Sequence, residues 1–302
     1  MLLSEITEFS FTLRFSVSPK LCIRFIMKLI DILCPPLADL RRIRATSYWL
    51  KEEVKVLGRR IEKVYGQLAH ERAVEEVFLQ LAARYPQIVE ELRDGALCVD
   101  CGAHVGHVSE VLLRLGARVE AFEPHPVLGH YLRMRLWEFV REGRLAVHLA
   151  AVGAKAAEVD LHILEPLEKT NLRGGLSESG TVCAEKAQVQ EQKSAESSGT
   201  QSGEATERPA EQTPPPPVRV RQVDLADFLQ RLGWPVTLLK LDIEGAEYEV
   251  LESLIACGAH ELCRHILVET HHQKIPALAP RAAALEQLLR DREVKNVYLD
   301  WI

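Results

Sequence analysis

Residues 97–106 read Leu-Cys-Val-Asp-Cys-Gly-Ala-His-Val-Gly, and this stretch decides the fold. It predicts a strand, Leu97 to Cys101, that runs into a glycine turn. A second predicted strand, Val119 to Phe122, is closed by Glu123. Glycines let a backbone approach a ligand closely, and a carboxylate at a strand end can accept ribose hydroxyl groups. The stretch therefore predicts a nucleoside-cofactor site.

The glycine spacing also bears on which cofactor fits. A dinucleotide motif needs a glycine where this chain has His104, so NAD and FAD are disfavoured. Asp100, two residues before Gly102, suits a ligand with positive charge, such as the amino and sulfonium groups of S-adenosylmethionine. A ligand-free strand-to-helix turn would explain Gly102 and Gly106 as well. The second half of the chain helps to choose between these interpretations.

Acidic residues follow two further predicted strands. Val236 to Asp242 is predicted to be a buried strand, and Ile243 to Glu247 opens a helix. His265 to Glu269 adds another strand with an acidic end. Ligands bind at the carboxyl ends of strands in open α/β sheets, so we expect Asp100, Glu123 and Asp242 to converge on one edge.

The remaining pattern alternates strands with helices, which predicts an α/β fold with a doubly wound, mainly parallel sheet. The expected elements are a helix at 127–141, a strand at 145–149, an adenine-facing loop at 150–153, strands at 159–164 and 218–223, and a last strand at 296–302.

Four segments resemble the FkbM family of methyltransferases. They are residues 99–109 (VDCGAHVGHVS), 122–126 (FEPHP), 239–251 (LKLDIEGAEYEVL) and 268–271 (VETH). The resemblance covers roughly residues 85–302 apart from an insertion. It implies the class I, Rossmann-like, S-adenosylmethionine-dependent methyltransferase fold and O-methylation of a hydroxyl on a sugar, glycan or small secondary metabolite. His104 stands where the family pattern usually has Asn.

The expected cofactor-binding residues are Asp100, Gly102, Ala103, His104, Gly106, Glu123 and Ala151. Transfer of a methyl group to an alcohol requires a base that removes the acceptor's proton. The candidates for catalysis are Asp242, Glu244 and His271, with Asp242 favoured. We expect Glu244 and Glu247 to share one helical face, and Glu247 to be either a solvated residue of that face or a partner of the dipole at the helix amino terminus.

Metal chemistry is a secondary expectation. No structural metal is predicted, since Cys98 and Cys101 should point to opposite faces of a strand. A divalent cation could be held by the carboxylates together with the substrate's oxygens, because hard oxygen ligands suit Mg²⁺.

The segment at residues 1–36 differs in character from the catalytic region. Residues Lys20 to Cys34 are predicted to form an apolar helix with a polar stripe, and Pro35 and Pro36 are expected to end it. The charges on Arg24 and Lys28 interrupt it too soon for a bilayer span of about 20 apolar residues. Two interpretations stay open: peripheral contact with a membrane surface, and packing on the catalytic domain or a partner chain.

Residues 37–83 are predicted to form a long helix with a coiled-coil seam. The seam residues are Leu40, Ile43, Ser47, Leu50, Val54, Leu57, Ile61, Val64 and Leu68. Their spacing of three and four, with Val54 and Ile61 at a positions and Leu50 and Leu57 at d, favours a parallel homodimer, and only Ser47 in the seam is polar. Gly58 and Gly66 argue against it, and a single helix folded back on its own domain is the alternative.

The methyltransferase domain is expected at residues 84–302, interrupted at about 177–217. That insertion is rich in Ser, Glu, Gln, Ala and Thr and ends in prolines, which predicts a disordered surface loop.

Composition limits the remaining functions. The chain has 302 residues, 47% of them hydrophobic, and a net charge of −6, while residues 1–60 are basic. Seven scattered cysteines suit a reducing cytoplasm, with membrane association as a further option. No nucleic-acid partner is expected, because the catalytic half is acidic. Two rival functions remain: a nicotinamide-dependent oxidoreductase, and a non-catalytic coiled-coil adaptor with a degenerate enzyme domain.

Overall fold

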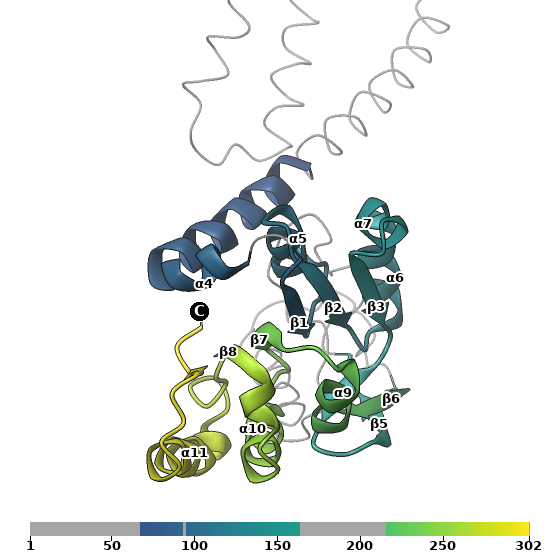
Figure 1. The fold of residues 1–302 in the computed structure, drawn as a ribbon. Coiled ribbons are helices and arrows are strands. Elements are labelled where there is room, and N and C mark those ends of the chain that lie inside the picture. Colours follow the sequence, from purple (N-terminus) through teal and green to yellow (C-terminus); the bar gives the residue numbers. More distant parts are fainter. Residues whose placement is uncertain (1–66, 93–94, 164–215, 302) are drawn as a thin grey trace, which may run out of the picture. The chain divides into compact units, whose positions relative to one another are not determined.

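The computed structural model describes residues 67–92, 95–163 and 216–301 (Figure 1). All of them belong to one unit, Lys63–Ile302. The amphipathic segment at 1–36, most of the predicted coiled coil and nearly all of the 177–217 insertion lie outside the described residues.

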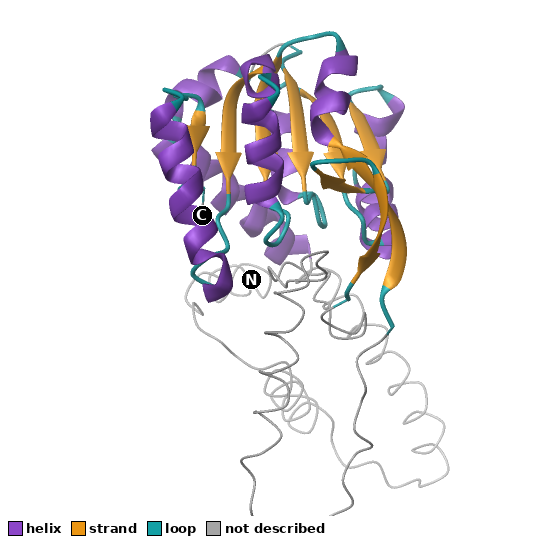
Figure 2. Ribbon diagram, turned by 90° about the horizontal axis from the view of Figure 1, so that it is seen from below, coloured by secondary structure: helices purple, strands orange, loops and turns teal. Residues whose placement is uncertain are grey.

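A six-stranded parallel sheet forms the centre of the domain, and its strands point the same way in Figure 2. Its order is β3-β2-β1-β7-β8-β9. The bounds are β1 Leu97–Cys101, β2 Arg118–Phe122, β3 Leu145–His148, β7 Val236–Leu241, β8 Cys263–Val268 and β9 Val297–Tyr298. Successive strands are added on one side of β1 as far as β3, and on the other side from β7 to β9. The boundary between β1 and β7 is therefore the topological switch point, where ligands bind in such sheets. The predicted doubly wound fold is confirmed.

A second, three-stranded sheet has the order β4-β6-β5. It comprises β4 Ala151–Gly153, β5 Ala157–Leu161 and β6 Val218–Asp224. The prediction of a loop at 150–153 is wrong, because β4 pairs in parallel with β6. Ala151 is buried in this sheet rather than displayed on a loop. A strand of three residues is too short to show an alternating pattern. Its partner β6 lies beyond the insertion, so neighbouring sequence gives no sign of the pairing either.

Helices cover both faces of the central sheet. They are the helix at 67–84, α4 Pro86–Glu91, α5 His107–Arg114, α6 Pro126–Arg135, α7 Trp137–Arg141, α9 Leu225–Leu232, α10 Glu247–Ala256 and α11 Ala279–Asp291, with 3₁₀ turns at Ala259–Leu262 and Pro276–Leu278. The predicted helix at 127–141 is divided at Leu136, and the predicted last strand is only Val297–Tyr298.

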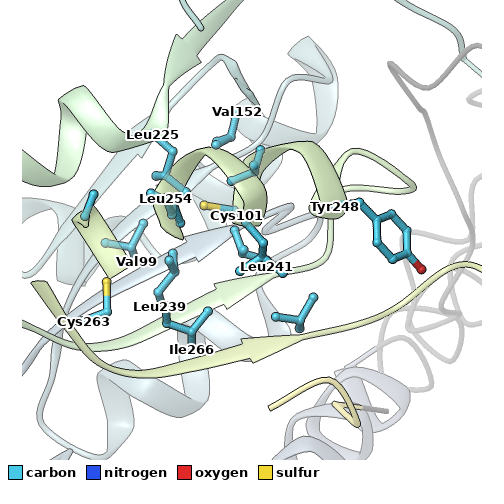
Figure 3. Packing of buried hydrophobic residues seen from close by; sticks show 14 of the residues in the cluster. Val99, Cys101, Val152, Leu225, Leu239, Leu241, Tyr248, Leu254, Cys263 and Ile266 are labelled. Carbon is cyan, nitrogen blue, oxygen red and sulfur yellow. The ribbon is translucent and has the colours of Figure 1, made fainter. Parts of the chain in front are cut away.

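Side chains alternate between the two faces of each strand, so the sheet has one hydrophobic core on each face. Val99 and Cys101 pack with Leu254 and other residues of α9, α10 and α11 on one face (Figure 3). Cys98 packs on the opposite face with residues of α4, α5 and α6. Successive side chains of a strand point to opposite faces, so Cys98 and Cys101 are separated as predicted. Both thiols are free.

The helix at 67–84 belongs to this second core. Its Val74, Val77 and Leu81 are buried there. His70 Nε2 lies 2.8 Å from Glu110 Oε2 on α5, and Arg135 of α6 also pairs with Glu110. The helical layer on this face therefore begins before residue 84. No helix among the described residues is both long and apolar enough to span a bilayer.

Candidate active site

The glycine turn after β1 is packed tightly against the end of β7. Gly102 has φ +78°, and a Cβ atom there would lie 1.8 Å from the carbonyl oxygen of Asp242. The backbone N–H groups of Gly102 and Ala103 donate to Phe122 O at 3.0 and 2.9 Å. Only glycine fits at Gly102, since a side chain would meet backbone and would also be strained by the positive φ.

His104 lies at the tip of this turn with φ +52°. Among residues other than glycine, Asn, Asp and His are enriched in this left-handed conformation. That requirement explains how His can stand where the family pattern usually has Asn. The His104 Nε2 atom is buried and has no hydrogen-bond partner among the described residues. Burial lowers the pKa of His104 to about 4, so the ring is neutral.

Glu123, directly after β2, is locked to the turn. Its carboxylate accepts hydrogen bonds from the backbone N–H groups of His104, at 2.7 Å, and His125, at 2.8 Å. Burial raises the pKa of Glu123 to about 7, although these two donors oppose the shift. Glu123 therefore changes charge near neutral pH.

Asp100 lies beneath the turn and is completely buried. The Ser109 hydroxyl donates to Asp100 Oδ2 at 2.6 Å, and Lys240 Nζ lies 3.4 Å from Oδ1. Direct contact between Asp100 and a cofactor, the role expected from the sequence, would need Lys240 to move. In this arrangement Asp100 acts on the turn through Lys240, which donates to Gly102 O at 3.0 Å.

Lys240 bridges the two halves of the site. Its ammonium group lies 3.1 Å from Asp242 Oδ2 as well as near Asp100. Burial opposes the charge, but these two carboxylates outweigh it and raise the pKa of Lys240 above its usual range. Burial also opposes ionisation of Asp242, yet Lys240 holds the pKa of that carboxyl below its usual value. Lys240 and Asp242 are therefore both charged, and the contact of Lys240 with Asp100 joins β7 to β1.

His271 gathers the acidic side chains at the ends of β7 and β8. The ring is completely buried, and its Nε2 lies 3.0 Å from Glu244 Oε2, 3.8 Å from Asp242 Oδ1 and 3.7 Å from Glu269 Oε1. Its Nδ1 lies 2.7 Å from Glu247 Oε1. Burial lowers the pKa of His271, but the surrounding carboxylates, Glu247 first, raise it overall. The three predicted catalytic residues thus meet in one place.

Glu247 corrects two of the sequence-based expectations. It is completely buried, not a solvated helix residue, and it accepts backbone N–H hydrogen bonds from Ile243 and Gly245 at 3.1 and 2.8 Å. Glu244 lies outside α10 at φ +60°, so the two residues do not share a helical face. The positive φ values of Glu244 and Gly245 make a turn, and the turn places both carboxylates on His271.

Sequence reasoning gave no site role to Lys240 or Glu247, and it treated Glu269 only as a strand end. One signal was available for Lys240, a charged residue within an otherwise apolar strand, Val236–Leu241. A buried lysine needs anionic partners, which the neighbouring strand end provides. Nothing local distinguishes Glu247 from the exposed Glu249.

A separate hollow of about 770 Å³ lies beside α9 and the small sheet. Its walls include Phe122, His148 and Phe228, whose rings contact one another. None of the predicted site residues lines it. Phe122 and His148 are the last residues of β2 and β3, so the hollow borders the same edge of the sheet as the predicted site residues.

A parallel sheet with helices on both faces, and with a glycine turn and acidic side chains at its switch point, defines a Rossmann-like fold. The family model of the methyltransferase FkbM domain matches residues 100–295. The chain belongs to this family, and the resemblance drawn from the four motifs is confirmed.

One solved structure in the comparison is methyltransferase FkbM from Methylobacillus flagellatus KT. It is 15% identical in sequence, with a TM-score of 0.39. The match covers 80% of this chain and 55% of that chain, so this chain spans about half the length of that protein. A comparison with curated proteins found no match.

Proposed function

We propose that this protein is an S-adenosylmethionine-dependent methyltransferase that methylates a hydroxyl oxygen of a sugar, glycan or small metabolite. One observation carries the proposal: Lys240 joins the glycine turn to the acidic cluster, through Gly102 O and Asp242 Oδ2. A donor site and an acceptor site on the same sheet edge are what methyl transfer requires, because the two reactants must be held in line.

The turn fits S-adenosylmethionine in three respects. Gly102 lets the turn pack directly on the Asp242 carbonyl, which holds the turn beside the acidic cluster, and Glu123 offers a buried carboxylate to ribose hydroxyls. His104 Nε2 is a buried polar atom that still lacks a partner among the described residues. The cofactor would supply a methyl group that is already activated as a sulfonium. The backbone of residues 102–106 and the side chains of Glu123 and His104 would hold it.

The acidic cluster would serve the acceptor. An alcohol is a weak nucleophile until its proton leaves, so a basic group must lie beside it. Asp242, Glu244 and His271 are the candidates, and the carboxylates of Asp242 and Glu244 both lie within 4 Å of His271 Nε2. Asp242 is kept ionised by Lys240, and its side chain is partly exposed, which favours it for contact with an acceptor.

Calorimetry with S-adenosylmethionine and with NAD tests the cofactor. We expect saturable binding of the first and none of the second, whereas tight NAD binding would support an oxidoreductase instead. Incubation with labelled S-adenosylmethionine and extracts of glycans, lipids and small metabolites then tests turnover. Cofactor binding without label transfer to any fraction would support the non-catalytic adaptor.

A further inference from the structure

His271 presents a nitrogen atom to an acidic cluster without a hydrogen bond. The ring is completely buried, and its Nε2 atom makes no hydrogen bond among the described residues. Nε2 nevertheless faces carboxylate oxygens of Asp242, Glu244 and Glu269 at 3.0 to 3.8 Å. A buried polar atom without a hydrogen bond is costly, so this nitrogen needs a partner.

Three of these groups have the spacing of metal ligands. One carboxylate oxygen each from Asp242 and Glu269 and one nitrogen of His271 all lie within 4.8 Å of one another. An octahedral ion with ligands at about 2.1–2.3 Å places opposite ligands about 4–5 Å apart and adjacent ones closer. A single ion between the three atoms could therefore contact all of them after small side-chain adjustments.

Glu247 provides the support that a ligating histidine usually has. Its carboxylate lies 2.7 Å from His271 Nδ1 and is itself held by the backbone N–H groups of Ile243 and Gly245. Histidine ligands commonly give their second ring N–H to a carboxylate, which fixes the tautomer and leaves the other nitrogen for the metal. A proton on Nδ1 facing Glu247 would leave the Nε2 lone pair directed at Asp242 and Glu269.

The backbone of the site is also fixed. The Asp242 N–H donates to Cys101 O at 3.2 Å, and the Glu269 N–H donates to Leu241 O at 2.9 Å. The carbonyl of His271 accepts from Lys274 and Ile275 at 3.0 and 2.8 Å. Asp242 and Glu269 thus follow anchored strand ends and His271 lies in an anchored turn, and such backbone anchoring keeps metal ligands in place.

We infer that Asp242, Glu269 and His271 bind one divalent cation, of a kind that accepts mixed oxygen and nitrogen ligands, such as Mn²⁺. The Asp242 and Glu269 side chains are 26% and 14% exposed, so one side of the ion would face the acceptor space. This inference rests on the proposed function for its substrate. An acceptor with two adjacent oxygens, such as a vicinal diol, would chelate the ion, and the ion would lower the pKa of the hydroxyl to be methylated.

Titration of the EDTA-treated full chain with Mn²⁺, followed by electron paramagnetic resonance, tests the site. We expect one ion per chain in the wild type, and affinity weaker by about tenfold or more in Glu269→Gln and in Asp242→Asn. Glu261→Gln, which changes an exposed acidic residue of the 259–262 turn, is the control and should bind as the wild type does. Equal affinity in all four proteins, or no saturable binding to the wild type, would overturn the inference.

A second measurement uses only the wild-type protein, so it does not depend on whether the variants fold. Spin-echo modulation of the bound Mn²⁺ in the wild type should show coupling to an imidazole ¹⁴N nucleus, because His271 would be a ligand. Absence of that coupling would remove His271 from the site and contradict the proposed ligand set.

The same preparation separates this inference from the proposed function. S-adenosylmethionine should bind in EDTA, since none of the groups assigned to it is one of the three ligands. If the cofactor binds but Mn²⁺ does not, only the metal inference fails. If Mn²⁺ binds at this site but the cofactor does not, the metal site stands and the proposed function fails.

Discussion

Glu123 should make cofactor binding depend on pH near neutrality. Its pKa is raised to about 7 by burial, and ribose hydroxyl groups donate best to the ionised carboxylate. We expect S-adenosylmethionine affinity to rise several-fold, up to about tenfold, between pH 6 and pH 8 as Glu123 loses its proton. Calorimetry at both pH values checks this. Glu123→Gln, which cannot ionise, should bind equally weakly at both, and a parallel pH rise in that variant would contradict the assignment.

The stability of the ligand-free protein should change in the opposite direction. Between about pH 4.5, the ordinary pKa of a glutamate, and pH 7, folded Glu123 keeps a proton that the unfolded chain has lost. The unfolded state then binds fewer protons, so this residue makes the folded state less stable as pH rises through that window, by about 3 kcal/mol in total. Urea unfolding of the wild type and Glu123→Gln at pH 5 and pH 8 would isolate the effect, which should be missing in the variant.

Asp242 should matter for turnover more than for cofactor affinity. Its carboxylate pairs with Lys240 and lies beside His271. We expect Asp242→Ala to reduce methyl transfer about 100-fold or more, while the dissociation constant for S-adenosylmethionine stays within about tenfold, equivalent to about 1.4 kcal/mol. Asp291→Ala, an exposed aspartate at the end of α11, serves as the control. Unchanged turnover in Asp242→Ala would remove this residue from the mechanism.

At the scale of elements, the contact between the glycine turn and β7 can be tested with matched substitutions. Gly102 and Gly233 have similar φ values, +78° and +67°, but a Cβ atom meets Asp242 O at Gly102 and open space at Gly233. Gly233→Ala should cost about 1 kcal/mol of unfolding free energy through backbone strain alone. Gly102→Ala should cost about 2–4 kcal/mol and weaken cofactor binding, because the turn must separate from β7. Equal costs would show that the steric contact is unimportant.

The turn between β7 and α10 depends on Glu247. Glu247→Ala would leave two backbone N–H groups and the buried His271 without their carboxylate, so we expect a loss of about 3 kcal/mol. Glu249→Ala, two residues along the same helix and exposed, should change stability by no more than about 0.5 kcal/mol. Thermal or urea unfolding of both variants measures the difference, and a small effect of Glu247→Ala would mean that the turn is held by other contacts.

Elements with strong local patterns were predictable from the sequence. β1, β2 and β7 are short strands rich in apolar residues and followed by an acidic residue or a glycine turn, and they lie where the sequence places them. The edge on which Asp100, Glu123 and Asp242 meet follows from parallel strand direction alone. β4 and the burial of Glu247 were not predictable, because each depends on a partner far along the chain or on a turn with positive φ.

For the whole molecule, the helix at 67–84 connects the domain to the predicted coiled coil. His70 on this helix pairs with Glu110, which also pairs with Arg135, and Arg135 donates to the carbonyl of Val105 in the glycine turn at 2.6 and 3.0 Å. A chain of polar contacts therefore links the helix at 67–84 to the glycine turn.

The predicted homodimer is the last consequence at this scale. Leu50 and Leu57 occupy d positions of the predicted seam, where charged side chains cannot be buried without large cost. We expect light scattering of the full chain to give twice the chain mass of 34.0 kDa, and Leu50→Asp with Leu57→Asp to give the mass of one chain. Glu52→Ala, outside the seam, should leave the dimer intact. A monomeric wild type would favour the alternative of a helix folded back on its own domain, since Val74, Val77 and Leu81 already pack there.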